Sequence, residues 1–211
     1  LVLIMLITIP ASIGLVLCNQ AVYSLFFMRG SFSAFDVSQS AIALAWYAPG
    51  LLFVGISRVA VPCFYAMKDT RTPVIISFWT LLVNLLAGLL LMQLMGHAGL
   101  ALALTMASVF NALMLIVLLA KRLGKLDLSG IFSTVTRTIP GLIFMSLVVA
   151  VILGQTDWLA TGPFLPRFAL LCAAVLSGAL VYAICLWVFG VREMQQAWSM
   201  IAGRLPLNRR T

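Results

Sequence analysis

The chain is dominated by long apolar runs, separated by short segments that carry nearly all of its charge. Six runs are long enough to cross a membrane as helices, because about 20 helical residues span the hydrocarbon core of a bilayer. We expect them over Leu1–Met28, Ser38–Met67, Val74–Met95, Leu100–Ala120, Thr138–Leu153 (or from near Ile131) and Phe168–Gly190. The predicted fold class is therefore an all-α, polytopic transmembrane helix bundle.

The first two predicted helices are longer than a bilayer requires. At about 1.5 Å per residue, each exceeds a hydrocarbon core of about 30 Å. Pro10 in the first helix, and Pro49 and Pro62 in the second, supply local causes for kinks. A broken helix is tolerated in a membrane only where its freed backbone groups face protein or water. We therefore predict that these two helices line an interior rather than lipid.

Composition supports a membrane protein. Of the 211 residues, 64% are hydrophobic and only 9% are charged, whereas soluble domains carry about 25% charged residues. The net charge of +8 would suggest nucleic acid in a soluble protein. Here the basic residues lie in the connections and the tail, so membrane topology explains them and we expect no nucleic-acid partner. No metal-ligand set, nucleophile elbow, P-loop or dinucleotide fingerprint is present, so enzymatic activity has no support.

The distribution of Lys and Arg predicts the orientation. Because spans alternate direction, the second-to-third connection, the fourth-to-fifth connection and the C-terminal tail share one face. That face carries ten basic residues, which are Lys68, Arg71, Lys121, Arg122, Lys125, Arg137, Arg192, Arg204, Arg209 and Arg210. The other face carries only Arg29 and Arg167. Positive charge stays on the cytoplasmic side, so the C-terminus is predicted to be cytoplasmic.

The two ends of the chain have different characters. After the last span, Met194, Ala197, Trp198 and Ile201 recur at helical spacing among polar residues. This pattern predicts a short amphipathic helix on the inner leaflet within residues 191–211, with partner binding as the alternative. The chain begins at Leu1 inside an apolar run and lacks signal-peptide features. We expect it to be part of a longer protein.

Arg58 is the most informative single residue. It lies nine residues before Met67, which is roughly 14 Å of helix from the cytoplasmic end of its span. A cation inside a bilayer costs at least about 2.5–3.5 kcal/mol on insertion scales, and it usually faces a cavity or a partner. Two interpretations stay open. Arg58 is either a contact for an anionic substrate such as a diphosphate, or a snorkelled or internally paired arginine.

Two asparagines form a second group of polar residues inside the membrane. The turn at residues 96–99 makes the third and fourth helices an antiparallel hairpin, and Asn84 and Asn111 are equidistant from it. Gly88 and Ala107 are also equidistant, and small residues allow helices to approach closely. We favour a hydrogen-bonded pair of amides that holds the two helices together, with an ion or substrate contact as the alternative. In the outer loop, Asp157 and Trp158 are predicted to mark the membrane interface.

Three loop strings carry a family resemblance. Arg29-Gly30-Ser31-Phe32 with Asp36 follows the first helix, and His97-Ala98-Gly99-Leu100-Ala101-Leu102-Ala103 opens the fourth. The most specific string, Phe64-Tyr65-Ala66-Met67-Lys68-Asp69-Thr70-Arg71-Thr72-Pro73, joins the second helix to the third. Together they resemble the bacterial lipid II flippase family (MurJ, or MviN) of the multidrug/oligosaccharidyl-lipid/polysaccharide exporter superfamily. In this string Asp69 can cap the next helix, with Pro73 in its first turn. Its role is either that of a structural hinge or that of a gate.

The resemblance implies a multi-pass transporter of the bacterial inner membrane, with fourteen helices in two lobes around a cationic cavity. Such proteins move an undecaprenyl-diphosphate-linked precursor between leaflets by alternating access. This chain would supply the last six helices, and the N-terminal lobe would be missing. Residues 1–120 would form four helices of the C-terminal lobe. Residues 121–190 would form two additional helices, which border a groove for lipid, and 191–211 the cytoplasmic tail.

The resemblance also bears on cofactors and on rival functions. Some family members bind sodium through an asparagine, a following acid and a threonine. Asn84 and Thr105 match, but Gly88 stands at the acid position, which argues against a sodium site. No other cofactor is expected. The rival functions are another exporter of the same superfamily, for polysaccharide-lipid or drugs, and a membrane scaffold that transports nothing.

Overall fold

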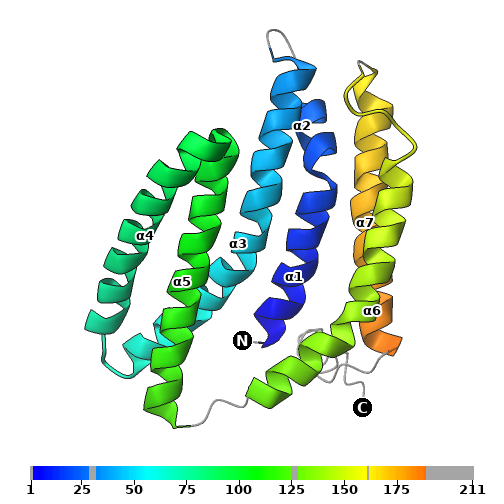
Figure 1. The fold of residues 1–211 in the computed structure, drawn as a ribbon. Helices are drawn as coiled ribbons and strands as arrows, with labels where there is room; N and C mark the ends of the chain where they lie inside the picture. Colours follow the sequence, from blue (N-terminus) through cyan, green and yellow to red (C-terminus); the bar gives the residue numbers. More distant parts are fainter. Residues whose placement is uncertain (1, 29–31, 125–127, 161, 189–211) are drawn as a thin grey trace, which may run out of the picture.

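The computed structural model describes residues 2–28, 32–124, 128–160 and 162–188. Every helix or strand in this described part is an α-helix (Figure 1). The helices are α1 (Val2–Leu17), α2 (Asn19–Phe27), α3 (Ala34–Ala66), α4 (Arg71–Met95), α5 (His97–Leu123), α6 (Leu128–Leu153) and α7 (Phe164–Val188). Five are individually long and apolar enough to cross a membrane, and α1 with α2 passes the same test only as a bent pair, which is either a broken span or a re-entrant segment. The predicted all-α bundle is confirmed, and the described part holds five or six candidate spans against the six predicted. The amphipathic segment predicted within 191–211 and residues 29–31 lie outside the described residues.

Several helices begin earlier than the apolar runs indicate. Helix α3 begins four residues before Ser38, because Ser33 and Asp36 form a capping box. The Ser33 amide donates to the Asp36 carboxylate at 2.8 Å, and the Asp36 amide donates to Ser33 Oγ at 3.4 Å. Helix α6 begins at Leu128, three residues before the earlier of the two predicted starts, Ile131 and Thr138, and its first turns run obliquely to the rest of the helix (Figure 1). Polar first turns therefore extend the helices beyond their apolar segments.

The first span breaks at a different place from the one predicted. The 63° bend lies between α1 and α2, at Cys18, and α1 continues through Pro10. Proline has no N–H, so the carbonyl of Leu6, four residues earlier, loses its helical donor. The hydroxyl of Tyr182 on α7 donates to this carbonyl at 3.0 Å. The freed backbone group therefore faces protein, as we predicted for this helix.

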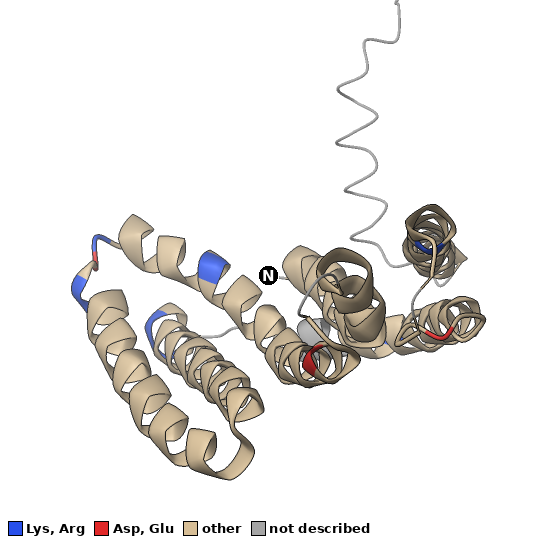
Figure 2. Ribbon diagram, turned by 90° about the horizontal axis from the view of Figure 1, so that it is seen from above, with Lys and Arg blue, Asp and Glu red and all other residues tan. Residues whose placement is uncertain are grey.

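The described helices pack around two apolar clusters. One cluster joins α1, α2, α6 and α7 and includes Leu25, Val149 and Leu186. The other joins α3, α4 and α5 around Phe64 and Leu115. Helices α1 and α2 also contact α3, so they connect α6 and α7 with the group formed by α3, α4 and α5 (Figures 1 and 2). The predicted division at residue 120 stays a prediction, but the first cluster crosses it.

Much of the bundle's outer surface is apolar. On α4, Val74, Phe78, Leu81 and Leu90 are more than 60% exposed in this chain by itself. Most of the charged positions lie at helix ends and in connections (Figure 2). Such faces are stable only against lipid or against further protein segments.

Candidate functional site

Arg58 lies on α3, eight residues before the helix ends at Ala66, or roughly 12 Å along its axis. Its exposed side chain lines an open hollow of about 460 Å³ between α3, α4 and α5. Ser57, Thr80, Ser108 and Asn111 contribute further polar groups to the same hollow. The one ion pair among the described residues joins Arg122 to Asp69. Within the described part, the interpretation of Arg58 as an internally paired arginine therefore has no partner to support it.

Hydrogen bonds fix the polar groups that surround this hollow. The Thr80 hydroxyl donates to the Ile76 carbonyl at 2.8 Å. Because its hydrogen is used there, its oxygen accepts from Asn111 Nδ2, at 2.9 Å. This bond joins α4 to α5 inside the predicted membrane region. The Ser57 and Ser108 hydroxyls each donate to a carbonyl four residues earlier, at 3.0 and 2.8 Å.

Asn111 bonds to Thr80 rather than to Asn84. The predicted hydrogen bond between the two asparagines is therefore wrong, although Asn111 does join α4 to α5. Helix α5 begins at His97 rather than Leu100. A Cβ at residue 99 would overlap the Leu91 carbonyl, so only glycine allows the first turn of α5 to lie this close to α4. The earlier start shifts the hairpin by about one helical turn. Asn111 is therefore opposite Thr80, four residues before Asn84.

Thr105 is turned away from α4. Its hydroxyl donates to the Trp46 carbonyl of α3 at 2.7 Å. A Cβ at Gly50 would lie 2.8 Å from Thr105 Oγ1, so the two helices touch at this point. Ala103 lies near Gly88 of α4, and Thr105 is two residues, or about 200°, further around α5. The structure does not bring Thr105 and Asn84 together.

The loop between α3 and α4 closes α3 with a Schellman motif. The Lys68 amide donates to the Tyr65 carbonyl at 2.9 Å, and the Asp69 amide donates to the Phe64 carbonyl at 3.0 Å. Lys68 has φ +58°, a left-handed conformation that usually favours glycine. This turn directs the chain from α3 into α4 and places Asp69 at the start of α4.

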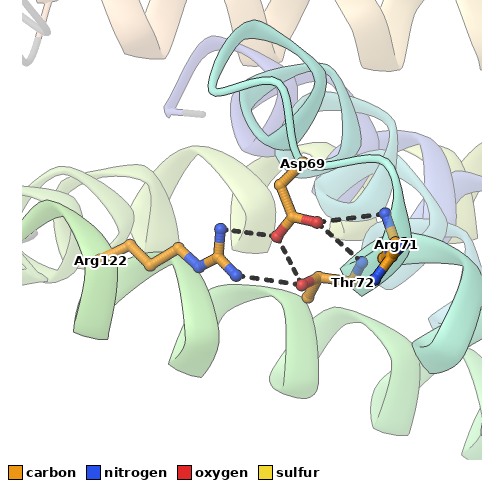
Figure 3. Close-up of polar contacts among 4 residues, drawn as sticks. All are labelled: Asp69, Arg71, Thr72 and Arg122. Carbon is orange, nitrogen blue, oxygen red and sulfur yellow. Dashed lines mark hydrogen bonds and ion pairs between the residues drawn. The ribbon is translucent and has the colours of Figure 1, made fainter.

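The carboxylate of Asp69 caps α4, as the sequence predicted (Figure 3). Its Oδ1 accepts from the backbone amides of Arg71 and Thr72 at 3.1 and 3.0 Å. Its Oδ2 accepts from the Thr72 hydroxyl at 2.5 Å. The Thr72 hydroxyl and amide, together with the Arg122 charge and the Arg71 amide, hold the pKa of Asp69 below its ordinary value. Thr70 is the residue before the first turn, and Pro73 lies buried inside that turn.

Arg122, in the last turn of α5, completes this contact, and the sequence did not reveal its role. Its Nη1 lies 2.6 Å from Asp69 Oδ2, and its Nη2 donates to Thr72 Oγ1 at 3.2 Å (Figure 3). The guanidinium also lies 5.7 Å from the ring centre of Phe64, which is fully buried. Arg122 therefore joins the last turn of α5 to the end of α3 and to the start of α4. The sequence predicts for Arg122 only a role in membrane topology, since nothing in its local sequence indicates a partner 53 residues away.

A second hollow, of about 550 Å³, lies between α1, α6 and α7. Its walls are apolar and include Leu6, Met145, Val149 and Val175. Tyr182 also lines it, but its hydroxyl is already bonded to the Leu6 carbonyl. The space suits an apolar chain rather than a polar ligand.

The loop between α6 and α7 is anchored on α2. Trp158 is 7% exposed, and its Nε1 donates to the Leu153 carbonyl at 2.9 Å. The Ser24 hydroxyl of α2 donates to the Trp158 carbonyl. That Trp158 marks the membrane interface stays a prediction, but its ring fills the core that α2 shares with α6 and α7 instead of facing outward. Arg167 holds the same loop by donating to the carbonyls of Ala160 and Asp157 at 2.7 and 3.0 Å.

Comparison with known proteins gives consistent matches. Residues 1–195 match the family described as lipid II flippase MurJ. The lipid II flippase MurJ of Burkholderia cenocepacia is 33% identical over 199 residues, which is 89% of this chain and 36% of that protein. The probable lipid II flippase MurJ of Haemophilus influenzae is 29% identical over 90% of this chain and 37% of its own length.

A solved structure gives the same result. The inward closed conformation of a lipid II flippase MurJ matches 88% of this chain and 36% of its own, with a TM-score of 0.66 and 25% identity. The chain thus spans little more than a third of the length of the relatives it matches.

Proposed function

This chain belongs to the lipid II flippase MurJ family, a family of multi-pass membrane transporters rather than enzymes, and from this premise we propose its function. It forms the C-terminal portion of a flippase that moves an undecaprenyl-diphosphate-linked peptidoglycan precursor from the cytoplasmic to the periplasmic leaflet by alternating access. The match over residues 1–195 carries this proposal. The missing N-terminal lobe of the same protein supplies the rest of the pathway.

Arg58 is the substrate contact that we propose within this chain. An arginine about 12 Å from the end of its span is costly in lipid, so its side chain belongs in a cavity or beside an anion. The diphosphate of the precursor is such an anion, and a guanidinium can bind it through two parallel hydrogen bonds. The hollow of about 460 Å³ beside Arg58 leaves room for this group.

The apolar hollow between α1, α6 and α7 is the place that we propose for the isoprenoid tail. Its walls are apolar apart from the Cys18 thiol and the Tyr182 hydroxyl, which is already bonded to the Leu6 carbonyl, and such walls suit a long hydrocarbon chain. In this arrangement the tail and the diphosphate occupy different sides of the chain. The tail lies against α6 and α7, and the charged head against α3, α4 and α5.

The loop from Asp69 to Pro73 acts, in this proposal, as a brace rather than as a gate. Asp69 caps α4, and Arg122 ties it to α5. Helices that are tied at one end by an ion pair, a hydrogen bond and a ring contact move together as a unit. This end lies in the cytoplasm if the ten basic residues on its side follow the positive-inside rule.

Complementation tests the proposal directly. The full-length gene, of which this chain is the C-terminal portion, is expressed in a bacterium depleted of its own flippase. Restored growth together with restored appearance of the precursor on the outer leaflet is expected. Failure to restore translocation, at normal protein level in the membrane, contradicts the proposed function. It leaves the exporter of another substrate and the scaffold as the alternatives.

A further inference from the structure

The hollow beside Arg58 offers hydrogen-bond acceptors as well as a positive charge. A hydroxyl has one donor and two lone pairs, and the Ser57, Thr80 and Ser108 hydroxyls spend their donors on carbonyls of their own helices. The Thr80 oxygen accepts from Asn111 Nδ2, which fixes which end of that amide touches Thr80. The Ser57 and Ser108 oxygens and Asn111 Oδ1 are left as acceptors for whatever enters the hollow.

This combination selects among ligand chemistries. A metal cation would find oxygen acceptors, but it would also meet the fixed charge of Arg58, which is always protonated. A simple inorganic anion would use Arg58 and leave the acceptors without donors. A ligand that satisfies both Arg58 and the oxygen acceptors carries a negative charge directly beside hydroxyl or amide N–H donors. A sugar joined to a phosphate has this character.

We propose that the hollow binds the junction between the diphosphate and the first sugar of the transported lipid. Arg58 contacts the phosphate, while Ser57, Ser108 and Asn111 accept hydrogen bonds from sugar hydroxyls or from an acetamido N–H. Thr80 is a positioning residue, because it holds the Asn111 amide with its oxygen free. The proposal rests on the proposed function and adds to it the residues that distinguish a glycosylated lipid from a bare polyprenyl diphosphate.

The depth of these residues supports the proposal. Arg58 is roughly 12 Å from the end of α3, and Thr80 is nine residues, or roughly 14 Å, from the start of α4 at Arg71. The half-thickness of a hydrocarbon core is about 15 Å. A polar hollow near mid-membrane cannot face lipid without exposing its cation to hydrocarbon. It therefore opens toward the interior of the complete transporter, where a headgroup would pass.

Binding to the purified full-length protein, compared for two probes, tests this inference. One probe is the complete precursor, and the other is undecaprenyl diphosphate without sugar. Asn111→Leu keeps the size of the side chain but removes the acceptor. It should weaken binding of the complete precursor roughly three- to tenfold, the effect of one or two neutral hydrogen bonds, and leave the sugar-free probe unchanged. Arg58→Gln should weaken both probes.

Further variants separate recognition from folding. Ser108→Ala and Thr80→Val are small changes that should reproduce the selective loss in part. Ser146→Ala is the matched control, because Ser146 on α6 makes the same bond to a carbonyl four residues earlier but lies outside the hollow. It should change neither probe.

The outcomes that contradict the inference differ from those that contradict the proposed function. If Asn111→Leu leaves both probes unchanged, or weakens both equally, the hollow does not recognise the sugar, and the inference fails while a flippase function stands. If the wild-type protein binds neither probe, or if Arg58→Gln changes the binding of neither probe, the contact between Arg58 and the diphosphate is contradicted. That contact belongs to the proposed function, on which this inference rests.

Discussion

Replacing Tyr182 by phenylalanine tests why α1 tolerates a proline at its centre. The Tyr182 hydroxyl donates to the Leu6 carbonyl at 3.0 Å, and Pro10 is the residue that cannot supply the normal helical donor. Tyr182 and Leu6 are 7% and 8% exposed, so water cannot replace the lost bond. Tyr182→Phe keeps the ring and leaves a buried carbonyl without a partner.

The expected loss of stability follows from two magnitudes. Interhelical hydrogen bonds in membrane proteins contribute about 0.6 kcal/mol on average and up to about 1.7 kcal/mol. A buried acceptor left unsatisfied costs about 1–3 kcal/mol. Because Pro10 removes the alternative donor, we expect Tyr182→Phe to cost about 1–2 kcal/mol, where the upper part of the first range overlaps the lower part of the second.

A double-mutant cycle isolates this effect. Pro10→Ala restores an N–H that can donate to the Leu6 carbonyl, so in that background Tyr182→Phe should cost less than about 0.5 kcal/mol. The contact between Tyr182 and Thr138 is the same in both backgrounds and cancels. The measurement is the unfolding free energy of the full-length protein in mixed micelles. Equal costs of Tyr182→Phe in the two backgrounds would refute the reasoning.

Three further predictions concern the α3–α5 contact and the loop after α3. Gly50→Ala places a Cβ 2.8 Å from Thr105 Oγ1 and should lower the unfolding free energy by about 1–3 kcal/mol; Thr105→Ala in the same protein should recover part of this loss. Lys68 has a left-handed backbone conformation, with φ +58°, which is costly for a residue with a Cβ. Lys68→Gly should therefore raise the unfolding free energy by about 1 kcal/mol, whereas Lys68→Ala should leave it unchanged. Thermal melting measures both effects. The pKa of Asp69 is lowered in the folded protein, so the stability that its carboxylate adds is present above the unfolded pKa of about 3.9 and is lost as pH falls through the folded pKa. Asp69→Asn should therefore make the melting temperature depend less on pH over this acid range. If the variant keeps the wild-type dependence of melting temperature on pH, the capping role is contradicted.

The sequence predicted those features that depend on neighbouring residues. Apolar runs of sufficient length predicted the fold class and the positions of the candidate spans, since a bilayer core sets the length of a helix. The cap at Asp69 was predictable because the carboxylate and the amide that it accepts from are three residues apart. The family strings added a function that no spacing of apolar residues could have indicated.

The features that the sequence did not predict depend on contacts between distant segments. The continuation of α1 through Pro10 could not be predicted without knowing that Tyr182, on the last described helix, satisfies the carbonyl that the proline frees. The partner of Asn111 depends on the register of the hairpin between α4 and α5. Because α5 begins three residues earlier than predicted, this register is shifted by about one helical turn. Arg122 looked like any other basic residue near the membrane until the fold placed it beside Asp69.

The central claim is that Arg58 contacts the anionic head of a lipid that this protein translocates. The most direct test is the rate at which the precursor appears on the outer leaflet of flippase-depleted cells that carry the full-length protein with Arg58→Gln, at a membrane level matched to the wild type. The account predicts translocation for the wild type and its loss for the variant. Wild-type translocation by the Arg58→Gln protein would contradict the account.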